Sequence, residues 1–164
     1  HHLVVTLGVD NLVVINTPDA TLISSKEMAD DLKNSLSRLP KKNREELYNH
    51  RKVYRPWGWF DVIDEGNFYK VKRLCVKPGG ELSYQYHKKR SEHWTVIDGV
   101  ATIKIEDKAQ KLTSGESIFI AQGERHSLVN NSKKRLEIIE VQSGKYFGED
   151  DIIRINDIYG RINK

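Results

Sequence analysis

The sequence predicts an all-β domain, an antiparallel sandwich or barrel, over residues 53–164. Short runs in which apolar and polar residues alternate recur about every 8 to 12 residues in this region. Turn sequences such as Pro78-Gly79-Gly80 and Asp98-Gly99 separate these runs. Many short strands with regularly spaced turns are typical of sandwiches and barrels, and this pattern carries the prediction.

The first 40 residues have a different pattern, which predicts short strands followed by a helix; the strands are expected at 3–7, 12–16 and 20–24. The spacing Ser24-x-x-Glu27 predicts a capping box that starts the helix, and Pro40 ends it. The apolar face of this helix carries Met28, Leu32, Leu36 and Leu39. That face either packs on its own strands or on an absent domain, or it is a docking surface.

Residues 1–40 are too few to build an independent core. We therefore expect them to be the tail of a larger domain, joined by a basic linker at residues 41–52 to the domain at 53–164. The linker holds five Lys/Arg and two Glu residues, and so contributes +3 to the net charge of +4. Such a run is usually solvated, and the remaining chain is nearly balanced, so no nucleic acid partner is expected.

Nine alternating runs are expected as strands of the main domain. Their ranges are 57–63, 68–76, 82–87, 92–98, 100–106, 110–114, 116–121, 125–130 and 136–143.

The chain shows no sign of secretion or of membrane insertion. No apolar run approaches the ~18 residues that a membrane span needs, and no secretory signal is visible. The single cysteine, Cys75, excludes an intrachain disulfide and a cysteine-cluster metal site, and its apolar surroundings predict a buried thiol. We expect a cytoplasmic protein with no membrane partner.

Four polar side chains stand where buried apolar residues would be expected. Strand periodicity puts Gln85 and His87 on one face, Glu92 on a face of the next strand opposite to His93, and His126 on a later strand. If all four point inward, a divalent cation would satisfy donors that cost roughly 1 to 3 kcal/mol each when buried without a partner. The alternatives are a hydrogen-bonded polar cluster and a set of solvent-facing residues.

The spacing of these residues resembles a family signature. Residues 79–99 resemble the first cupin motif, G-x5-H-x-H-x4-E-x6-G, with Gln85 in place of the first histidine. Residues 115–130 resemble the second motif, G-x5-P-x-G-x2-H-x3-N, with Ala121 in place of proline. The resemblance implies a cupin jelly roll (a double-stranded β-helix) with a divalent metal on Gln85, His87, Glu92 and His126. This mixed nitrogen and oxygen set suits Zn²⁺ and tolerates Co²⁺, Mn²⁺ or Fe²⁺.

The flanking sequence resembles a narrower family. The stretches YRPWGWFDV and IEVQSGKYFGEDDIIRINDIYGR are similar to type II phosphomannose isomerases, the C-terminal part of bacterial mannose-1-phosphate guanylyltransferase/mannose-6-phosphate isomerases. Residues 3–40 are similar to the end of the transferase domain, whose nucleotide-binding loop is not in this sequence, so we expect no nucleotidyl transfer by this chain. The resemblance implies a homodimer that interconverts mannose 6-phosphate and fructose 6-phosphate in the GDP-mannose pathway.

Isomerisation needs a base and a phosphate site. Glu140 is the candidate base and Gln142 would orient a hydroxyl, provided that their face of the strand lines the cavity rather than the face of Ile139 and Val141. Arg90 is the first candidate for the 6-phosphate and for a catalytic role. Arg154 and Arg161, which are similar to C-terminal arginines of the family, are further candidate phosphate ligands.

Two other functions fit the same fold. A cupin dioxygenase would need Fe²⁺ and would consume O₂. A non-catalytic module that binds a sugar phosphate, or dimerises to regulate the transferase, would carry almost no metal after purification.

Overall fold

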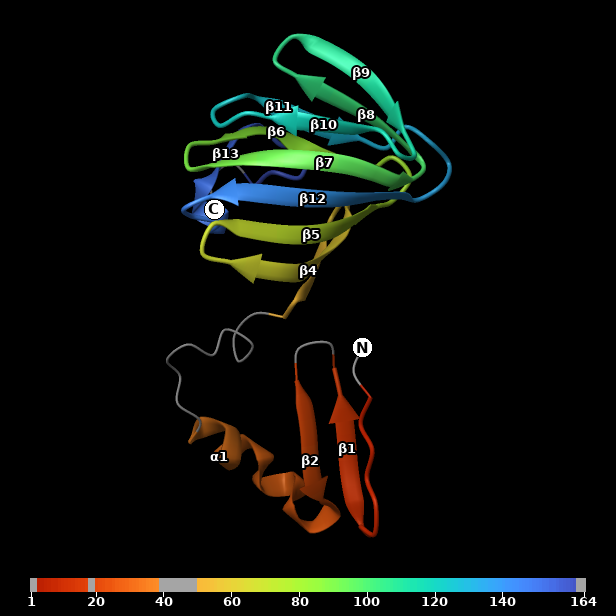
Figure 1. Cartoon of the computed structure of the whole chain (residues 1–164), viewed down its shortest axis with the longest axis vertical. Helices are drawn as coiled ribbons and strands as arrows, with labels where there is room; N and C mark the ends of the chain where they lie inside the picture. Colours follow the sequence, from red (N-terminus) through yellow and green to blue (C-terminus); the bar gives the residue numbers. More distant parts are fainter. Residues whose placement is uncertain (1–2, 18–19, 39–49, 162–164) are drawn as a thin grey trace. The chain divides into compact units, whose positions relative to one another are not determined.

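The computed structural model describes residues 3–17, 20–38 and 50–161, and the chain divides into a first unit, residues 1–51, and a second unit, residues 52–164. The first unit contains β1 (Leu12–Asn16), β2 (Thr21–Ser25), the 3₁₀ helix η1 (Lys26–Asp31) and α1 (Leu32–Ser37), which Figure 1 shows in red and orange. The basic run at residues 41–49 lies outside the described residues.

The first unit has no buried core among its described residues. Strands β1 and β2 pair antiparallel, with Leu12 opposite Ser25, as expected from two of the three apolar runs. The strand predicted at residues 3–7 is not formed. Apolar side chains of this segment therefore remain open to solvent: Leu3 and Leu7 are 88% and 93% exposed.

The predicted helix is present but begins differently. Ser24 lies in β2 and donates its hydroxyl to the carbonyl oxygen of Ser25, so it does not cap the helix. A 3₁₀ turn precedes α1, and Asp31 is the N-cap residue of α1. Met28 and Leu36 are about half exposed, whereas Leu39 and Pro40 lie outside the described residues. In the described part of the chain, no helix has the length and apolarity needed to cross a membrane.

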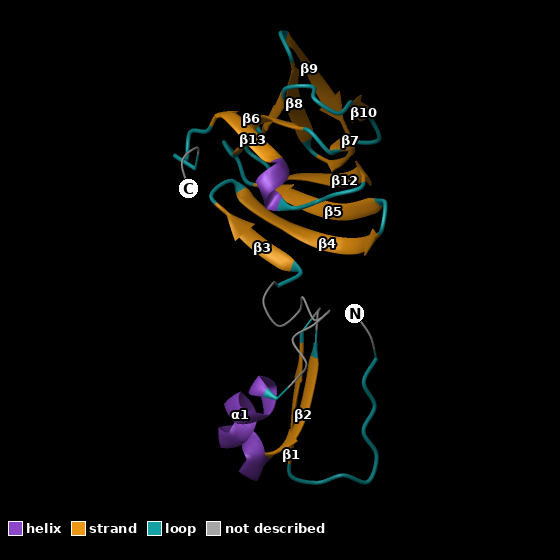
Figure 2. Cartoon of the chain, turned by 90° about the vertical axis from the view of Figure 1, so that its left-hand side faces the viewer, coloured by secondary structure: helices purple, strands orange, loops and turns teal. Residues whose placement is uncertain are grey.

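The second unit consists of two antiparallel sheets that face each other (Figures 1 and 2). The six-stranded sheet has the order β10 (Ser117–Ile120), β7 (Arg90–Asp98), β12 (Leu136–Gly144), β5 (Tyr69–Val76), β4 (Gly58–Gly66) and β3 (Lys52–Arg55). The five-stranded sheet has the order β13 (Ile152–Asn156), β6 (Glu81–His87), β11 (His126–Val129), β8 (Val100–Ile105) and β9 (Lys108–Thr113). A 3₁₀ turn, η3 (Glu149–Asp151), precedes β13.

All nine strands predicted for this unit are present, with ends that differ by a few residues. Two strands were missed. Strand β3 starts at the last residue of the predicted linker and ends before the first predicted strand, and β13 lies in a stretch for which no element was predicted. Both strands extend an edge of their sheet, β3 next to β4 and β13 next to β6.

The space between the sheets is apolar at one end and polar at the other. Along β7 the buried residues change from Glu92 through Trp94 to Val96. Their cross-strand partners on β12 repeat this order as Gln142, Glu140 and Ile138. In the other sheet, His126 pairs with Gln85 and Leu128 pairs with Leu82. The register thus places the polar residues of several strands at the same level, above a shared hydrophobic core.

A glycine fixes the turn between β3 and β4. Gly58 has φ of 149°, and a Cβ on it would lie 2.0 Å from the carbonyl oxygen of Cys75 on β5. Only glycine lets the backbone approach β5 this closely. The turn that follows Arg55 and contains Trp57 is therefore held against the sheet.

Replacing Ile138 by alanine is expected to lower the free energy of unfolding of the second unit by about 2–5 kcal/mol, because a fully buried side chain leaves a cavity. Urea unfolding followed by tryptophan fluorescence measures this loss, since all three tryptophans lie in the second unit. Ile139→Ala is the matched control, because Ile139 is the next residue of the same strand and is only partly buried. Equal losses in the two variants would contradict the assignment of the core face.

Candidate active site

Two histidines and one carboxylate from three strands meet at the polar end of the interior. His87 ends β6, Glu92 lies near the start of β7, and His126 starts β11. Each is at most 2% exposed. Their candidate ligand atoms all lie within 4.8 Å of one another. The sequence prediction that these three side chains converge agrees with this geometry.

The two imidazole rings turn their Nε2 atoms toward Glu92. His87 Nε2 lies 3.0 Å from Glu92 Oε1, and His126 Nε2 lies 3.7 Å from Glu92 Oε2. Both Nε2 atoms are buried and neither makes a hydrogen bond. Their Nδ1 atoms face backbone carbonyl oxygens, that of Asp151 at 3.2 Å for His87 and that of Glu124 at 2.9 Å for His126. Because a carbonyl can only accept, each Nδ1 carries the proton and each Nε2 presents a lone pair, the tautomer that metal-binding histidines use.

The positions of the two histidines are also tied together through the backbone. Gly123, with φ of 87°, donates its N–H to the carbonyl oxygen of His87 at 2.8 Å. The turn that leads into β11 is therefore fixed to the end of β6. The two rings lie 5.1 Å apart between centroids, which leaves their Nε2 atoms convergent.

Gln85 lies at the same level on β6. It pairs with His126 in the register between β6 and β11, and it lines the cavity beside Glu92. Its Oε1 accepts a hydrogen bond from the Ser83 hydroxyl at 2.6 Å. The amide oxygen is thus held inside the cavity, and its role as a metal ligand stays a prediction.

The electrostatics keep Glu92 ionised. Burial alone would raise the pKa of the Glu92 carboxyl, but His87, His126 and Arg90 beside it outweigh burial and lower that pKa. Burial also lowers the pKa of His126, although the charge of Glu92 opposes this shift. A divalent cation binds the ionised form of a carboxylate and the neutral form of an imidazole, and the lowered pKa values of Glu92 and His126 both favour these forms.

A second carboxylate, Glu140 on β12, lies beside the first. The indole Nε1 of Trp94 donates to Glu140 Oε2 at 3.0 Å and to Glu92 Oε2 at 3.1 Å. The amide of Gln142 donates to Glu140 Oε1 at 2.8 Å and to Glu92 Oε1 at 3.0 Å. Glu140 and Gln142 are 4% and 1% exposed, whereas Ile139 and Val141 are less buried, so the face with Glu140 is the inner one. This resolves the alternative that the sequence left open.

Glu140 also contacts a buried lysine that the sequence reasoning missed. Lys72 is 7% exposed, and its Nζ lies 3.7 Å from Glu140 Oε1 and 4.8 Å from the centre of the Phe60 ring. Burial, followed by the charge of Glu92, raises the pKa of Glu140 to about 7 in spite of this lysine. The strand pattern could have predicted that Lys72 points inward, since Lys72 alternates with the buried residues Leu74 and Val76 on β5.

Arg90 is buried beside Glu92. Its Nε donates to Glu92 Oε1 at 3.1 Å, and its Nη1 donates to the carbonyl oxygen of Gly148 at 3.3 Å. The same Nη1 lies 3.5 Å from Asp151, whose carboxylate also accepts from the backbone N–H groups of Lys88 and Lys89. Asp151 thus fixes the segment between the predicted ligands His87 and Glu92. The sequence analysis did not identify Asp151 as a site residue.

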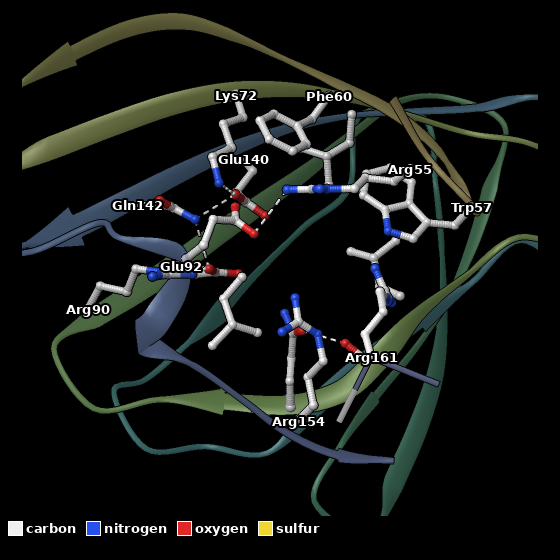
Figure 3. Close-up of a pocket in the computed structure, with 16 residues that line it drawn as sticks. Arg55, Trp57, Phe60, Lys72, Arg90, Glu92, Glu140, Gln142, Arg154 and Arg161 are labelled. Atoms are coloured by element: carbon white, nitrogen blue, oxygen red, sulfur yellow. Dashed lines mark hydrogen bonds and ion pairs between the residues drawn. The ribbon is translucent and has the colours of Figure 1, made fainter. Parts of the chain in front are cut away.

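An open cavity connects these groups with three arginines (Figure 3). It contains about 470 Å³ of empty space, a volume that includes the open solvent at its mouth. Glu92, Glu140 and Gln142 lie on one side, and Arg154 and Arg161 lie on the other (Figure 3). The third arginine, Arg55, was not predicted, although it lies in one of the stretches that carried the family resemblance.

Arg154 reaches the cavity through β13, where it pairs with Gln85. Its Nε is buried and has no hydrogen-bond partner. Burial, followed by the charge of Arg161, lowers the pKa of Arg154. Arg161 itself donates to both oxygens of Asp157, at 2.9 and 2.5 Å. At this end of the cavity, the positive charges of Arg154 and Arg161 therefore lie close together, and the Nε–H donor of Arg154 has no partner.

The chain matches known proteins over almost its whole length. The family model described as "Mannose-6-phosphate isomerase C-terminal" matches residues 42–157, and the model described as "MannoseP isomerase/GMP-like beta-helix domain" matches residues 1–39. The mannose-1-phosphate guanylyltransferase of Salmonella montevideo is 46% identical over 159 residues, 97% of this chain and 34% of that protein. The alginate biosynthesis protein AlgA of Pseudomonas aeruginosa is also 46% identical, over 97% of this chain and 33% of its own length. The chain thus spans about a third of the length of these relatives.

The fold has counterparts among solved structures. A protein from Klebsiella pneumoniae with a double-stranded β-helix domain superposes with a TM-score of 0.51 at 22% identity, covering 61% of this chain and 83% of that one. This similarity, together with the two opposed sheets, confirms the cupin (double-stranded β-helix) fold that was predicted for the second unit. Since the family model covers most of the chain and the curated relatives are nearly half identical, the chain belongs to the mannose-6-phosphate isomerase C-terminal family.

Proposed function

We propose that the second unit is a metal-dependent isomerase that interconverts mannose 6-phosphate and fructose 6-phosphate. The observation that carries the proposal is the pair of buried, unbonded imidazole nitrogens that converge on Glu92, beside a second buried carboxylate. The membership of the isomerase family and the arginines at the other end of the cavity support the substrate. The homodimer and the cytoplasmic location stay predictions.

The donor set fits a divalent cation. Two neutral imidazoles and one carboxylate, with the amide oxygen of Gln85 as the fourth candidate, suit Zn²⁺ and also Co²⁺, Mn²⁺ or Fe²⁺. When bound, the ion would supply a Lewis acid that stabilises the negative oxygen of an enediolate. Arg90 and Gln142 hold the Glu92 carboxylate from the other side, and we assign Arg90 mainly to this positioning role. Its binding of phosphate stays a prediction.

Glu140 is the proposed base. In the forward direction, its carboxylate would take the proton from C2 of open-chain mannose 6-phosphate and return it to C1 of the enediolate, while the proton of the 2-hydroxyl moves to O1. A pKa of about 7 suits a group that both accepts and donates a proton near neutral pH. The Nζ of Lys72 stabilises the ionised form, and the Trp94 indole and Gln142 amide fix the carboxylate in one orientation.

Gln142 and the arginines would position the sugar. The Oε1 atom of Gln142 is buried and has no hydrogen-bond partner, so it is available to accept a bond from a sugar hydroxyl. Arg154 and Arg161 would bind the 6-phosphate, because a guanidinium matches the geometry of phosphate oxygens. The function is tested by a coupled assay of fructose 6-phosphate formation, with and without a chelator. Turnover that a chelator abolishes and a divalent metal restores is expected, and the absence of turnover with every metal would overturn the proposal.

Replacing His126 by alanine is expected to remove bound metal and isomerase activity together, because one of the two imidazole donors is lost. Metal content by mass spectrometry and the coupled assay measure the two effects on the same sample. His93→Ala is the control, since His93 follows Glu92 on β7 but is exposed on the outer face. Full activity with His126→Ala would refute the metal site.

Replacing Glu140 by glutamine is expected to leave metal content unchanged and to lower kcat by about 10²–10⁴, the usual contribution of a positioned base. The control is Glu137→Gln on the same strand, where Glu137 lies on the outer face and pairs with Arg73. Unchanged turnover, with metal still bound, would remove Glu140 as the base.

A further inference from the structure

The arginine end of the cavity contains an acidic side chain that the proposed reaction does not use. Glu149, in η3, lines the cavity, and its Oε2 lies 3.1 Å from Nη2 of Arg55. The two residues are 94 positions apart in the sequence. This ion pair therefore links the end of β3 to η3, beside the same cavity that Arg154 and Arg161 line.

The three arginines are not equally free to bind an anion. Arg161 is committed to Asp157, to which it donates from its backbone N–H and from two side-chain nitrogens. Arg154 has a buried Nε without a partner. Arg55 has Glu149 as its ion-pair partner, and its guanidinium lies 5.5 Å from the centre of the Phe60 ring on the cavity wall. Arg55 is thus already oriented, and its carboxylate partner is the group that an incoming anion would replace.

Exchanging this partner should cost little. The side chain of Glu149 is 51% exposed and that of Arg55 is 33% exposed. Ion pairs at such exposed positions contribute little to stability. A phosphate dianion carries more charge and more acceptor oxygens than one carboxylate, and it would also meet the unused donor of Arg154.

We infer that Arg55 is a third phosphate-binding residue of this cavity, in addition to Arg154 and Arg161. Glu149 is the counter-ion of Arg55 until a phosphate dianion displaces the Glu149 carboxylate. The inference rests on the proposed function for the identity of the ligand as a sugar phosphate. The phosphate site thereby gains a ligand from the first strand of the second unit, Arg55, and a competing carboxylate, Glu149. The site therefore discriminates between phosphorylated and unphosphorylated sugars through a replaceable carboxylate.

The test is the affinity for inorganic phosphate, measured by calorimetric titration of the full chain in buffer that contains a chelator. Arg55→Ala is expected to weaken binding by about 10- to 100-fold, the loss of a charge-assisted hydrogen-bond pair. Arg55→Lys, which keeps the charge but loses the fork, should weaken it less. Glu149→Gln is expected to tighten binding a few-fold, because the competing charge is removed. The control Arg73→Ala, an arginine paired with Glu137 on the outer face of the sheet, should leave binding unchanged.

The opposite signs of the two effects separate this inference from a structural role of the ion pair. If the pair only stabilises the fold, Arg55→Ala and Glu149→Gln will change phosphate affinity in the same direction or leave it alone, and either result overturns the inference. No phosphate binding by the unmodified chain would also overturn it. The titration does not depend on turnover, so the expected pattern in a chain that fails to isomerise would support the anion site while refuting the proposed reaction.

Discussion

The site depends on one constraint, the burial of the Glu92 charge. An ionised carboxylate inside a protein is costly unless charged or hydrogen-bonding partners surround it. Here Arg90, Gln142 and Trp94 donate to it, and the two histidines face it with their Nε2 atoms. The arrangement leaves two ring nitrogens without hydrogen bonds, and this deficit is what a cation would satisfy.

Strand register is what brings these groups to one level. Since the buried positions of β7 and β12 run from polar to apolar in parallel, the same few strands supply both the core and the site. The apolar end, around Val96 and Ile138, provides the stability that offsets the cost of the polar end. Substitutions at the two ends are therefore expected to separate stability from activity.

Much of the second unit could be predicted from the sequence, because its signals are local. Alternation located nine strands, and the cupin spacing of His87, Glu92 and His126 anticipated their convergence. The strand at 3–7 was wrong because β-branched composition alone does not provide a pairing partner. The helix start was wrong because β2 continues through Ser25, and its pairing with β1 overrides the capping signal of Ser24.

The remaining features depend on contacts between distant segments. Lys72 could have been assigned to the inner face by its alternation with Leu74, but its contact with Glu140 follows only from the pairing of β5 with β12. The short edge strands β3 and β13 have weak patterns, and each carries an arginine into the cavity. Whether the face of Glu140 or that of Ile139 was buried could not be decided from alternation, since both faces contain residues that a core accepts.

The most direct measurement is anomalous diffraction at the absorption edge of the metal, from crystals of the full chain grown with Zn²⁺ or Co²⁺. We expect a single strong peak in the second unit, bounded by the Nε2 atoms of His87 and His126 and the carboxylate of Glu92. A crystal in which these three groups enclose no peak, or in which the ion binds elsewhere in the unit, would contradict this expectation.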